Sequence, residues 1–350
     1  MNLLDKTQEG IYCIAEMSAN HAGDLQNALK IVRAAKESGA SCLKIQTYTP
    51  DSMTINCNNE FFTIKGGLWD GYTLYDLYKE ASTPYEWHRA IKDECDAAGI
   101  DFLSTPFDEE GVDFLDELGV GAFKVASFEL VDIPLIKYIA KKGKPMLVSC
   151  GMGSYEEISD AVDAILSTGL SKEKLFLLKC TSEYPAKIED MDLYTIPHMA
   201  ERFGVTVGLS DHSLGSLAPT VAVALGARVI EKHFCLSRSI KNPDSAFSSE
   251  PEEFAQMVQS VNQALLSCGV AQYGPTDSEQ KSLAFRRSIF AVEDIAKDEV
   301  FTQDNIRVIR PGYGLAPKYF SNLLGKKSPL AYLKGTPIQM PWQQDQNEEQ

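Results

Sequence analysis

Short apolar runs rich in β-branched residues alternate with longer amphipathic segments along most of the chain. This alternation predicts repeated strand-helix units and a parallel sheet. Helix boundaries are also marked, since Asp24 can cap a helix that Gly39 ends, and Ser154 can cap another. The eight predicted strands are 12–15, 42–46, 101–104, 122–126, 146–149, 175–179, 205–209 and 228–232. Eight units in about 265 residues fit a (β/α)8 TIM barrel better than an open doubly wound sheet.

Three segments depart from the strand-helix pattern. Residues 50–82 are rich in Asn, Gly, Thr and Tyr, and they are far longer than the ~2 to 6 residues of an ordinary loop between a strand and a helix. We expect them to form an insertion at the catalytic end of the barrel, in the position of a lid. A linker over 271–285 should follow the 1–270 barrel and lead to a small β-rich domain over 286–341. The polar tail 342–350 should be disordered.

The charge excludes large polyanionic partners. The chain carries 33 Lys and Arg against 49 Asp and Glu, a net charge of -16, so we expect no nucleic-acid and no membrane-surface binding through a general positive field. An anionic ligand would need a local basic pocket. The chain shows no secretory signal and no apolar run of membrane-spanning length, and its eight scattered cysteines contain no C-x-x-C pair. We therefore expect reduced, structural cysteines and a cytoplasmic location.

The predicted strand ends are unusually polar. In a TIM barrel the active site forms at the carboxyl ends of the strands and in the loops that follow. Buried charge is costly unless it is paired or used, so these groups predict an active site. The polar residues at or just after the strand ends include Glu16, Asn20, Lys44, Gln46, Thr105, Lys124, Ser127, Glu129, Ser149, Ser182, Tyr184, Ser210, His212 and His233.

Two of these histidines, His212 and His233, end the neighbouring seventh and eighth strands. Adjacent strands lie roughly 5 Å apart, so the two rings can converge on one divalent ion such as Mn²⁺ or Zn²⁺. Glu16 ends the first strand, next to the eighth in a closed barrel, and can complete the metal shell or act as an acid or base. The alternative is a pair of core histidines bonded to the backbone. His21 is a weaker candidate, and we expect His88 and His198 to lie on the surface.

Lys44 and Lys124 should point into the same cavity as hydroxyl groups from Thr105, Ser127, Ser149 and Ser182. Two ammonium groups and several hydroxyls suit a phosphate or a carboxylate, and they would form the basic pocket that the acidic chain needs. Two alternatives remain open. The lysines can pair with Glu16, Glu129 or Glu231 in a structural network, or one of them can form a Schiff base.

Linked motifs in this order resemble the sialic acid synthase family, whose members condense phosphoenolpyruvate with a sugar to make nine-carbon 2-keto sugar acids. The matching strand ends read IAEMSANHAGD, LKIQTY, FLSTPFD, KVASFEL, PMLVSCGM, LLKCTSEYPA, GLSDHSLG and EKHF. The segment RRSIFAVEDIAKDEVFTQDNIRVIRPGYGLAP resembles the antifreeze-like (SAF) domain of that family. The resemblance covers nearly the whole chain and implies a TIM barrel followed by an SAF domain.

The resemblance also implies roles for individual residues. His212 and His233 would bind a divalent cation (Mn²⁺, Mg²⁺ or Co²⁺), and Glu16 would act beside it. Phosphoenolpyruvate would be held by Lys44, Thr105, Lys124, Ser127, Ser149 and Ser182, whereas Gln46, Tyr184, Ser210 and Asp244 would surround the metal and the sugar. The family forms a domain-swapped homodimer, whose SAF domain brings an arginine to the partner's sugar. Arg310 is the expected arginine, with Arg287 second.

One segment discriminates within the family. Residues 242–248 read NPDSAFS, which resembles the branch that makes pseudaminic acid from a 2,4-diacetamido-2,4,6-trideoxy hexose. Phe247, in a segment where the neuraminate branch carries a histidine, fits a less hydroxylated acetamido sugar. We therefore expect a pseudaminic acid synthase, with N-acetylneuraminate or legionaminic acid synthesis as the alternative. Two readings outside the family's chemistry are a Schiff-base aldolase or lyase using Lys124 and a carbohydrate-binding protein whose barrel is only a scaffold.

Overall fold

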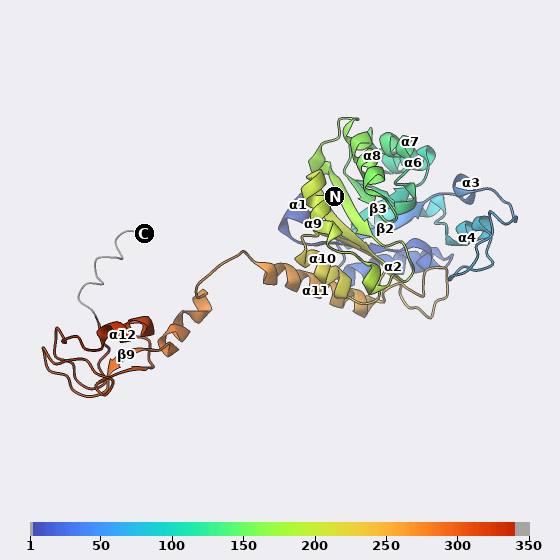
Figure 1. The fold of residues 1–350 in the computed structure, drawn as a ribbon. Coiled ribbons are helices and arrows are strands. Elements are labelled where there is room, and N and C mark those ends of the chain that lie inside the picture. Colours follow the sequence, from blue (N-terminus) through green and yellow to red (C-terminus); the bar gives the residue numbers. More distant parts are fainter. Residues whose placement is uncertain (1–2, 340–350) are drawn as a thin grey trace. The chain divides into compact units, whose positions relative to one another are not determined.

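The computed structural model describes residues 3–339, and the chain divides into two compact units between Gly269 and Val270 (Figure 1). The division falls where the sequence predicts the end of the barrel domain. The predicted disorder of 342–350 concerns residues outside the described part of the chain. Among the described residues, no helix is long and apolar enough to cross a membrane.

The N-terminal unit is built on a parallel eight-stranded sheet with the order β3-β2-β1-β8-β7-β6-β5-β4. The two end strands of this order, β3 and β4, also lie against each other, which closes the sheet into the predicted barrel. Each observed strand coincides with a predicted one to within two residues at either end. The strands are β1 (Tyr12–Glu16), β2 (Cys42–Thr47), β3 (Asp101–Pro106), β4 (Phe123–Val125), β5 (Met146–Ser149), β6 (Leu175–Cys180), β7 (Thr206–Asp211) and β8 (Val229–His233).

Helices surround this sheet, and their caps follow the sequence. Asp24 accepts a hydrogen bond from the Gln26 amide at the start of α2, and Ser154 forms a capping box with Glu157 at the start of α8. Both predicted caps are confirmed. The helices of this unit are α1 (Leu3–Glu9), α2 (Leu25–Glu37), α3 (Pro50–Met53), α4 (Leu74–Ala81), α5 (His88–Ala98), α6 (Glu109–Leu118), α7 (Ile133–Ala140), α8 (Tyr155–Leu166), α9 (Thr195–Phe203), α10 (Leu217–Ala224) and α11 (Pro251–Cys268).

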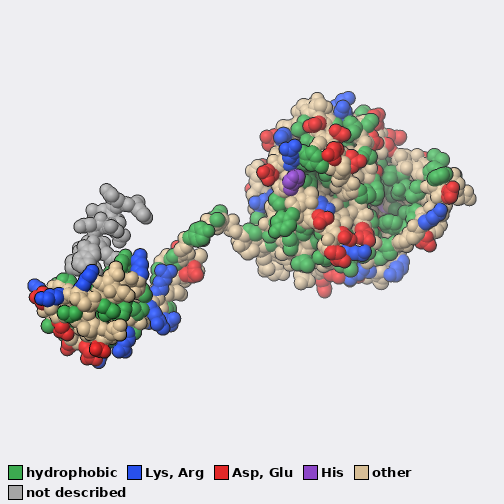
Figure 2. Space-filling model, in the orientation of Figure 1, with side chains coloured by type: hydrophobic (Ala, Val, Ile, Leu, Met, Phe, Trp, Pro, Cys, Tyr) green, Lys and Arg blue, Asp and Glu red, His purple; other side chains and the backbone are tan. Residues whose placement is uncertain are grey.

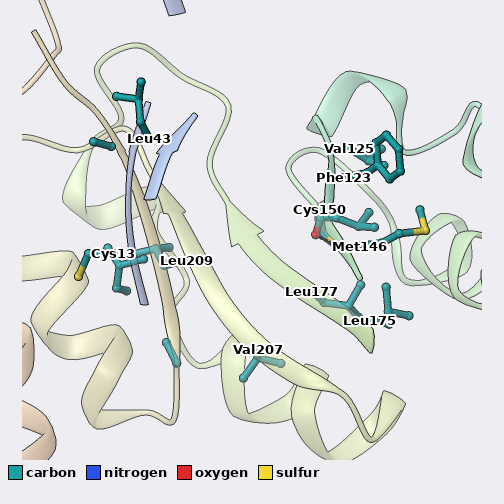
Figure 3. Close-up of a cluster of buried hydrophobic side chains, with 14 of the residues drawn as sticks. Cys13, Leu43, Phe123, Val125, Met146, Cys150, Leu175, Leu177, Val207 and Leu209 are labelled. Atoms are coloured by element: carbon teal, nitrogen blue, oxygen red, sulfur yellow. Dashed lines mark hydrogen bonds between the residues drawn. The ribbon is translucent and has the colours of Figure 1, made fainter. Parts of the chain in front are cut away.

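The strands present different residues to the two sides of the barrel wall. Successive side chains in a strand alternate between the faces. Outward-facing residues such as Leu43, Val125 and Leu177 belong to the core under the helices (Figure 3). Inward-facing residues such as Ile14 and Leu147 form a second core inside the barrel. Continuing the inward series by two residues leads from these apolar side chains to the polar strand ends, so the barrel interior itself carries the functional groups.

The predicted insertion over 50–82 is present and partly ordered. It contains the short helices α3 and α4, which begin after the capping residues Thr49 and Thr73. A single antiparallel bridge joins Thr63 to Thr73. The insertion projects from one side of the barrel unit (Figure 1).

The C-terminal unit has its own small core. An antiparallel pair, β9 (Ser288–Ala291) and β10 (Ile306–Ile309), packs with α12 (Phe320–Leu323), and the core includes Ile289, Phe301 and Ile306. The predicted linker is more ordered than expected, because Asp277–Phe285 forms an exposed 3₁₀ segment that begins with a capping box between Thr276 and Glu279. Figure 2 shows basic and acidic side chains side by side on this unit.

Candidate active site

A small polar cavity of about 50 Å³ lies at the carboxyl ends of the barrel strands. It gathers most of the polar strand-end residues that the sequence singled out. The lining residues are Glu16, Lys44, Gln46, Lys124, Ala126, Ser127, Phe128, Ser149, Cys180, Tyr184, Ser210, His212, Glu231 and His233. Both lysines therefore reach one cavity, as predicted.

Two ammonium groups and two carboxylates interlock in this cavity. The Lys44 Nζ lies 2.6 Å from Glu16 Oε2 and 3.7 Å from Glu231 Oε1, and the Lys124 Nζ lies 3.5 Å from Glu231 Oε1. The ion-pair network that the sequence left open as an alternative is thus present, with Glu231 as the shared carboxylate. Such pairing stabilises buried charge, and a bound anion can take over the same ammonium groups.

The pKa values of the two carboxyl groups are shifted in opposite directions in this network. Burial raises the pKa of Glu16 to about 7, because the pull of Lys44 only partly offsets desolvation and the Glu231 charge adds to the rise. The pKa of Glu231 is lowered despite its burial, since Lys124 and Lys44 both attract its charge. Burial and the charge of Lys44 lower the pKa of Lys124. One carboxyl group is therefore poised to exchange a proton near neutral pH while the other stays ionised.

Hydroxyl and amide groups surround the ammonium groups. Ser127 Oγ accepts the Gly151 amide at 3.0 Å, and Lys44 donates to Thr105 Oγ1 at 3.3 Å. The buried Ser149 Oγ has no hydrogen-bond partner within residues 3–339. A Cβ on Gly151 would lie 2.3 Å from Ser182 Oγ and 2.8 Å from Ser127 Oγ. The absence of that carbon leaves a space lined by donors, which suits the oxygens of a phosphate.

His212 and His233 converge with ring centroids 5.5 Å apart. His212 Nδ1 donates to the Thr181 carbonyl at 2.9 Å, which leaves Nε2 as the free acceptor. Burial lowers the pKa of His233, so its imidazole is neutral. Its Nδ1 has no hydrogen-bond partner among the described residues. Burial opposes protonation of His212, but its contact with the Cys180 thiol raises its pKa above the ordinary value. In their neutral forms, both imidazoles would offer a ring nitrogen to a divalent metal. No group of three or more His, Cys, Asp or Glu residues in the described chain forms a metal site, so other ligands would have to come from water or substrate.

A second, larger cavity of about 370 Å³ adjoins the polar one. The two share Gln46, Ala126, Phe128, Tyr184 and His233. Figure 2 shows apolar side chains gathered between the barrel and the insertion. The rest of the larger cavity is lined by Ser18, Tyr48, Met53, Ile64, Trp69, Leu74, Leu77, Tyr78, Ala81, Phe107, Glu129, Pro243 and Asp244.

Contacts of Trp69 hold the insertion against the loops that line this larger cavity. Trp69 Nε1 donates to the Pro243 carbonyl at 3.0 Å, and the Trp69 ring lies 5.7 Å from that of Tyr184. Sequence reasoning missed Trp69 and the aromatic wall of Tyr48, Tyr78 and Phe107. The available signal was the concentration of aromatic residues in the segments after β2 and β3.

Several predicted residues lie around the cavities in supporting positions. Asp244 lines the larger cavity and accepts the Ala19 amide at 3.0 Å, and burial raises its pKa. Asn20 donates to Ser248 Oγ at 2.8 Å, joining the loop after β1 to the loop after β8. Phe247 lies edge-on to His233, with centroids 4.9 Å apart. Neither Asn20 nor Phe247 is among the lining residues of the two cavities in the described structure.

Ser210 and Glu129 are both placed at the cavities. Ser210 Oγ donates to Glu231 at 3.3 Å in the polar cavity. Glu129 faces the larger one, where burial raises its pKa to about 7 and its Oε2 is unpartnered within the described chain. Arg310 belongs to the C-terminal unit, where it is exposed and precedes a cis proline.

The prediction that His88 lies on the surface is wrong. Its ring is fully buried, with Nε2 2.8 Å from Thr47 Oγ1 and Nδ1 3.1 Å from the Pro84 carbonyl. The buried face of α5 carries His88, Ile91 and Cys95 at helical spacing, and this spacing was the signal that reasoning overlooked. His198 is exposed, as predicted.

Known proteins resemble the chain over most of its length. A pseudaminic acid synthase of Campylobacter jejuni is 48% identical over 92% of this chain and 93% of its own length. An N,N'-diacetyllegionaminic acid synthase of Legionella pneumophila is 37% identical over 93% of each chain. The crystal structure of an N-acetylneuraminic acid synthetase from Leptospira borgpetersenii matches with a TM-score of 0.70 and 30% identity, over 78% of this chain and 90% of that one.

Two family models match adjacent parts of the chain. The SAF domain model covers residues 286–341, the range that the sequence predicted for the C-terminal domain. The NeuB family model covers residues 31–273, which include every predicted barrel residue from Lys44 to Phe247. Together with the polar strand ends, these matches show that the chain belongs to the NeuB family of sialic acid synthases, with a C-terminal SAF domain.

Proposed function

We propose that this chain is a pseudaminic acid synthase. It would condense phosphoenolpyruvate with the open-chain aldehyde of 2,4-diacetamido-2,4,6-trideoxy-altrose and water, giving pseudaminic acid and phosphate. The observation that carries the proposal is the junction of a small cavity holding two ammonium groups with a larger, mainly apolar cavity. A small dianionic acid suits the first, and an acetamido sugar with few hydroxyl groups suits the second. The 48% identity to a pseudaminic acid synthase supports this choice within the family.

In this proposal Lys44 and Lys124 bind the carboxylate and phosphate of phosphoenolpyruvate. Substrate would draw the ammonium groups away from Glu16 and Glu231, with which they pair in the described structure. Ser127, Ser149, Ser182 and the Gly151 amide would bind the phosphate oxygens, and Thr105 would hold the Lys44 ammonium in place. Charged donors in a buried site bind such oxygens strongly, since water does not compete.

His212 and His233 would hold a divalent cation, Mn²⁺, Mg²⁺ or Co²⁺, at the junction of the two cavities. When bound, such an ion acts as a Lewis acid that polarises the sugar aldehyde. Thr181 fixes the His212 tautomer through its carbonyl, and Phe247 and Tyr184 pack against the His233 ring or near it. These contacts keep both imidazoles oriented toward the junction.

The reaction requires one new C–C bond and one C–O cleavage. C3 of phosphoenolpyruvate attacks the aldehyde carbon, whose oxygen takes up a proton and becomes a hydroxyl. Water then adds to the cationic C2, and the tetrahedral adduct releases phosphate to leave the 2-keto acid. Glu16, with its pKa raised to about 7, would orient that water and accept its proton. Lys44 and Lys124 would stabilise the departing phosphate.

The proposal extends to the assembly. We propose a domain-swapped homodimer in the cytoplasm, in which Arg310 of one SAF domain reaches the sugar bound by the other barrel. The exposure of Arg310 leaves its guanidinium free to contact another chain.

Phosphate release from phosphoenolpyruvate tests the function. The purified protein with Mn²⁺ should release phosphate with 2,4-diacetamido-2,4,6-trideoxy-altrose, and at least tenfold more slowly with N-acetylmannosamine or with the diacetamido precursor of legionaminic acid. Faster turnover of either competitor would assign the chain to that branch instead. No release with any of the three sugars would contradict the proposal.

A Schiff-base aldolase remains the second candidate, because burial and Lys44 lower the pKa of Lys124. Borohydride with pyruvate separates the two functions. A synthase should remain unlabelled, whereas an aldolase should gain a covalent adduct on Lys124 that Lys124→Met abolishes.

A further inference from the structure

Tyr48 is a buried tyrosine in the wall of the larger cavity. It directly follows Thr47, the last residue of β2, and it lines the larger cavity with only 2% of its surface exposed. As a lining residue of this cavity, its side chain can meet a ligand bound there. Burial and the nearby charge of Asp244 raise its pKa, so the hydroxyl stays protonated and available as a donor.

Two aromatic rings hold the Tyr48 ring in place. Tyr78 and Phe107 meet it edge-on, with centroids 5.9 Å and 5.3 Å away. The same cavity wall continues through Leu74 and Leu77 of α4. A single fixed donor among apolar groups matches the two sides of an acetamido group, whose carbonyl accepts a hydrogen bond and whose methyl group requires apolar contact.

The position of Tyr48 indicates which part of a sugar it would meet. Gln46 and His233 line both cavities, whereas Tyr48 lines only the larger of the two in the described structure. The aldehyde reacts at the junction, so Tyr48 lies beyond the reacting end of the sugar. A substituent near the middle of the chain, rather than the one next to the aldehyde, would reach it.

We propose that the Tyr48 hydroxyl donates a hydrogen bond to the carbonyl of the C4 acetamido group, with its methyl group packed between Tyr78 and Phe107. This inference rests on the proposed function and names the residue that selects a 4-acetamido sugar. A sugar with a hydroxyl at C4 would lose both interactions.

Tyr48→Phe removes only the hydroxyl and keeps the ring between its two neighbours. We expect kcat/KM for the 2,4-diacetamido sugar to fall roughly tenfold, mainly through KM, since one buried hydrogen bond is lost. The KM for phosphoenolpyruvate should stay within about twofold, since the Tyr48 side chain is outside the polar cavity. With the same sugar carrying a hydroxyl at C4, kcat/KM should be nearly equal in the variant and the wild type.

Tyr85→Phe is the matched control. Tyr85 packs against His88 and Phe114 and is absent from both cavity linings among the described residues, so its variant should behave as the wild type. An unchanged kcat/KM in Tyr48→Phe, or an equal loss with both sugars, would overturn the role of Tyr48. A wild-type protein that releases no phosphate with the diacetamido sugar would instead contradict the proposed function.

Discussion

Lys44 Nζ lies 2.6 Å from Glu16 Oε2 inside the barrel, and the two residues are direct partners across β1 and β2. The register of the sheet therefore sets the proposed base, Glu16, beside the ammonium group proposed to bind phosphate, Lys44. On its other side Glu16 is paired with His233 of β8. Three adjacent strands thus bring together the proposed base, the proposed anion-binding cation and a proposed metal ligand.

Glu16→Gln should lower kcat by roughly 10²- to 10⁴-fold, because the amide cannot accept a proton from water. In the wild type, kcat should decrease as the pH falls below about 7, since protonation of Glu16 removes the base. Phosphate-release assays across pH 5.5 to 8.5 measure the loss in kcat of the variant and the pH dependence of kcat in the wild type. The exposed Glu201 on α9 gives the control Glu201→Gln, which should be unaffected. Wild-type turnover by Glu16→Gln would exclude Glu16 as the base.

Gly151→Ala should weaken phosphoenolpyruvate binding. Its Cβ would lie 2.3 Å from Ser182 Oγ and 2.8 Å from Ser127 Oγ, so both hydroxyls must shift from the proposed phosphate position. We expect the KM for phosphoenolpyruvate to rise about tenfold or more and the sugar KM to change little. Gly10→Ala controls for general effects on stability, because an added Cβ at Gly10 would meet no atom within 4 Å and its φ is not positive. A normal phosphoenolpyruvate KM in Gly151→Ala would remove Ser127 and Ser182 from that site.

Removal of one imidazole should weaken metal binding strongly. The described residues offer only two histidines at the junction, so His212→Ala leaves a single protein ligand of this kind. We expect the affinity for Mn²⁺, measured by electron paramagnetic resonance, to fall by about 100-fold or more, with an unchanged circular dichroism spectrum. Full activity after chelation would contradict a metal role, as would normal Mn²⁺ binding by His212→Ala.

His88 should make the barrel sensitive to acid. Burial lowers its pKa to about 4, below the ~6.5 of an unfolded chain, so the unfolded state binds the additional proton between these values. The neutral ring stabilises the fold fully above about pH 6.5. As pH falls toward 4, about 3 kcal/mol of this stability should be lost. Burial also lowers the pKa of His21 to about 4, which adds to the effect.

Urea denaturation at pH 5 and pH 7.5 measures the loss. His88→Gln should reduce the difference in the free energy of unfolding between pH 5 and pH 7.5. His198→Gln, at an exposed position on α9, should leave this difference unchanged. An equal pH difference in the wild type and His88→Gln would show that His88 is not the responsible group.

The polar strand ends were predictable because side chains alternate between the two faces of each barrel strand, so every second residue faces inward. Once the eight strands are recognised, Glu16, Lys44 and Lys124 must follow Ile14, Cys42 and Ala122 on the inward face. Tyr48 and Trp69 could not be found in this way. The position of Trp69 depends on tertiary contacts with Pro243 and Tyr184, and the ring of Tyr48 packs against Phe107 from the segment after β3. No short-range pattern specifies such contacts.

Mixing two inactive variants tests the domain swap and the role of Arg310 together. His212→Ala should disable the barrel, and Arg310→Ala should disable the donated arginine. In a swapped dimer, a mixed pair holds one intact barrel served by the intact Arg310 of its partner. Equal amounts allowed to exchange at random should therefore regain about one quarter of wild-type activity. If Arg310 serves its own barrel, neither site in the mixed dimer is complete and no activity should return. Sedimentation of each variant must first show a dimer, because a monomeric wild type would contradict the swap directly.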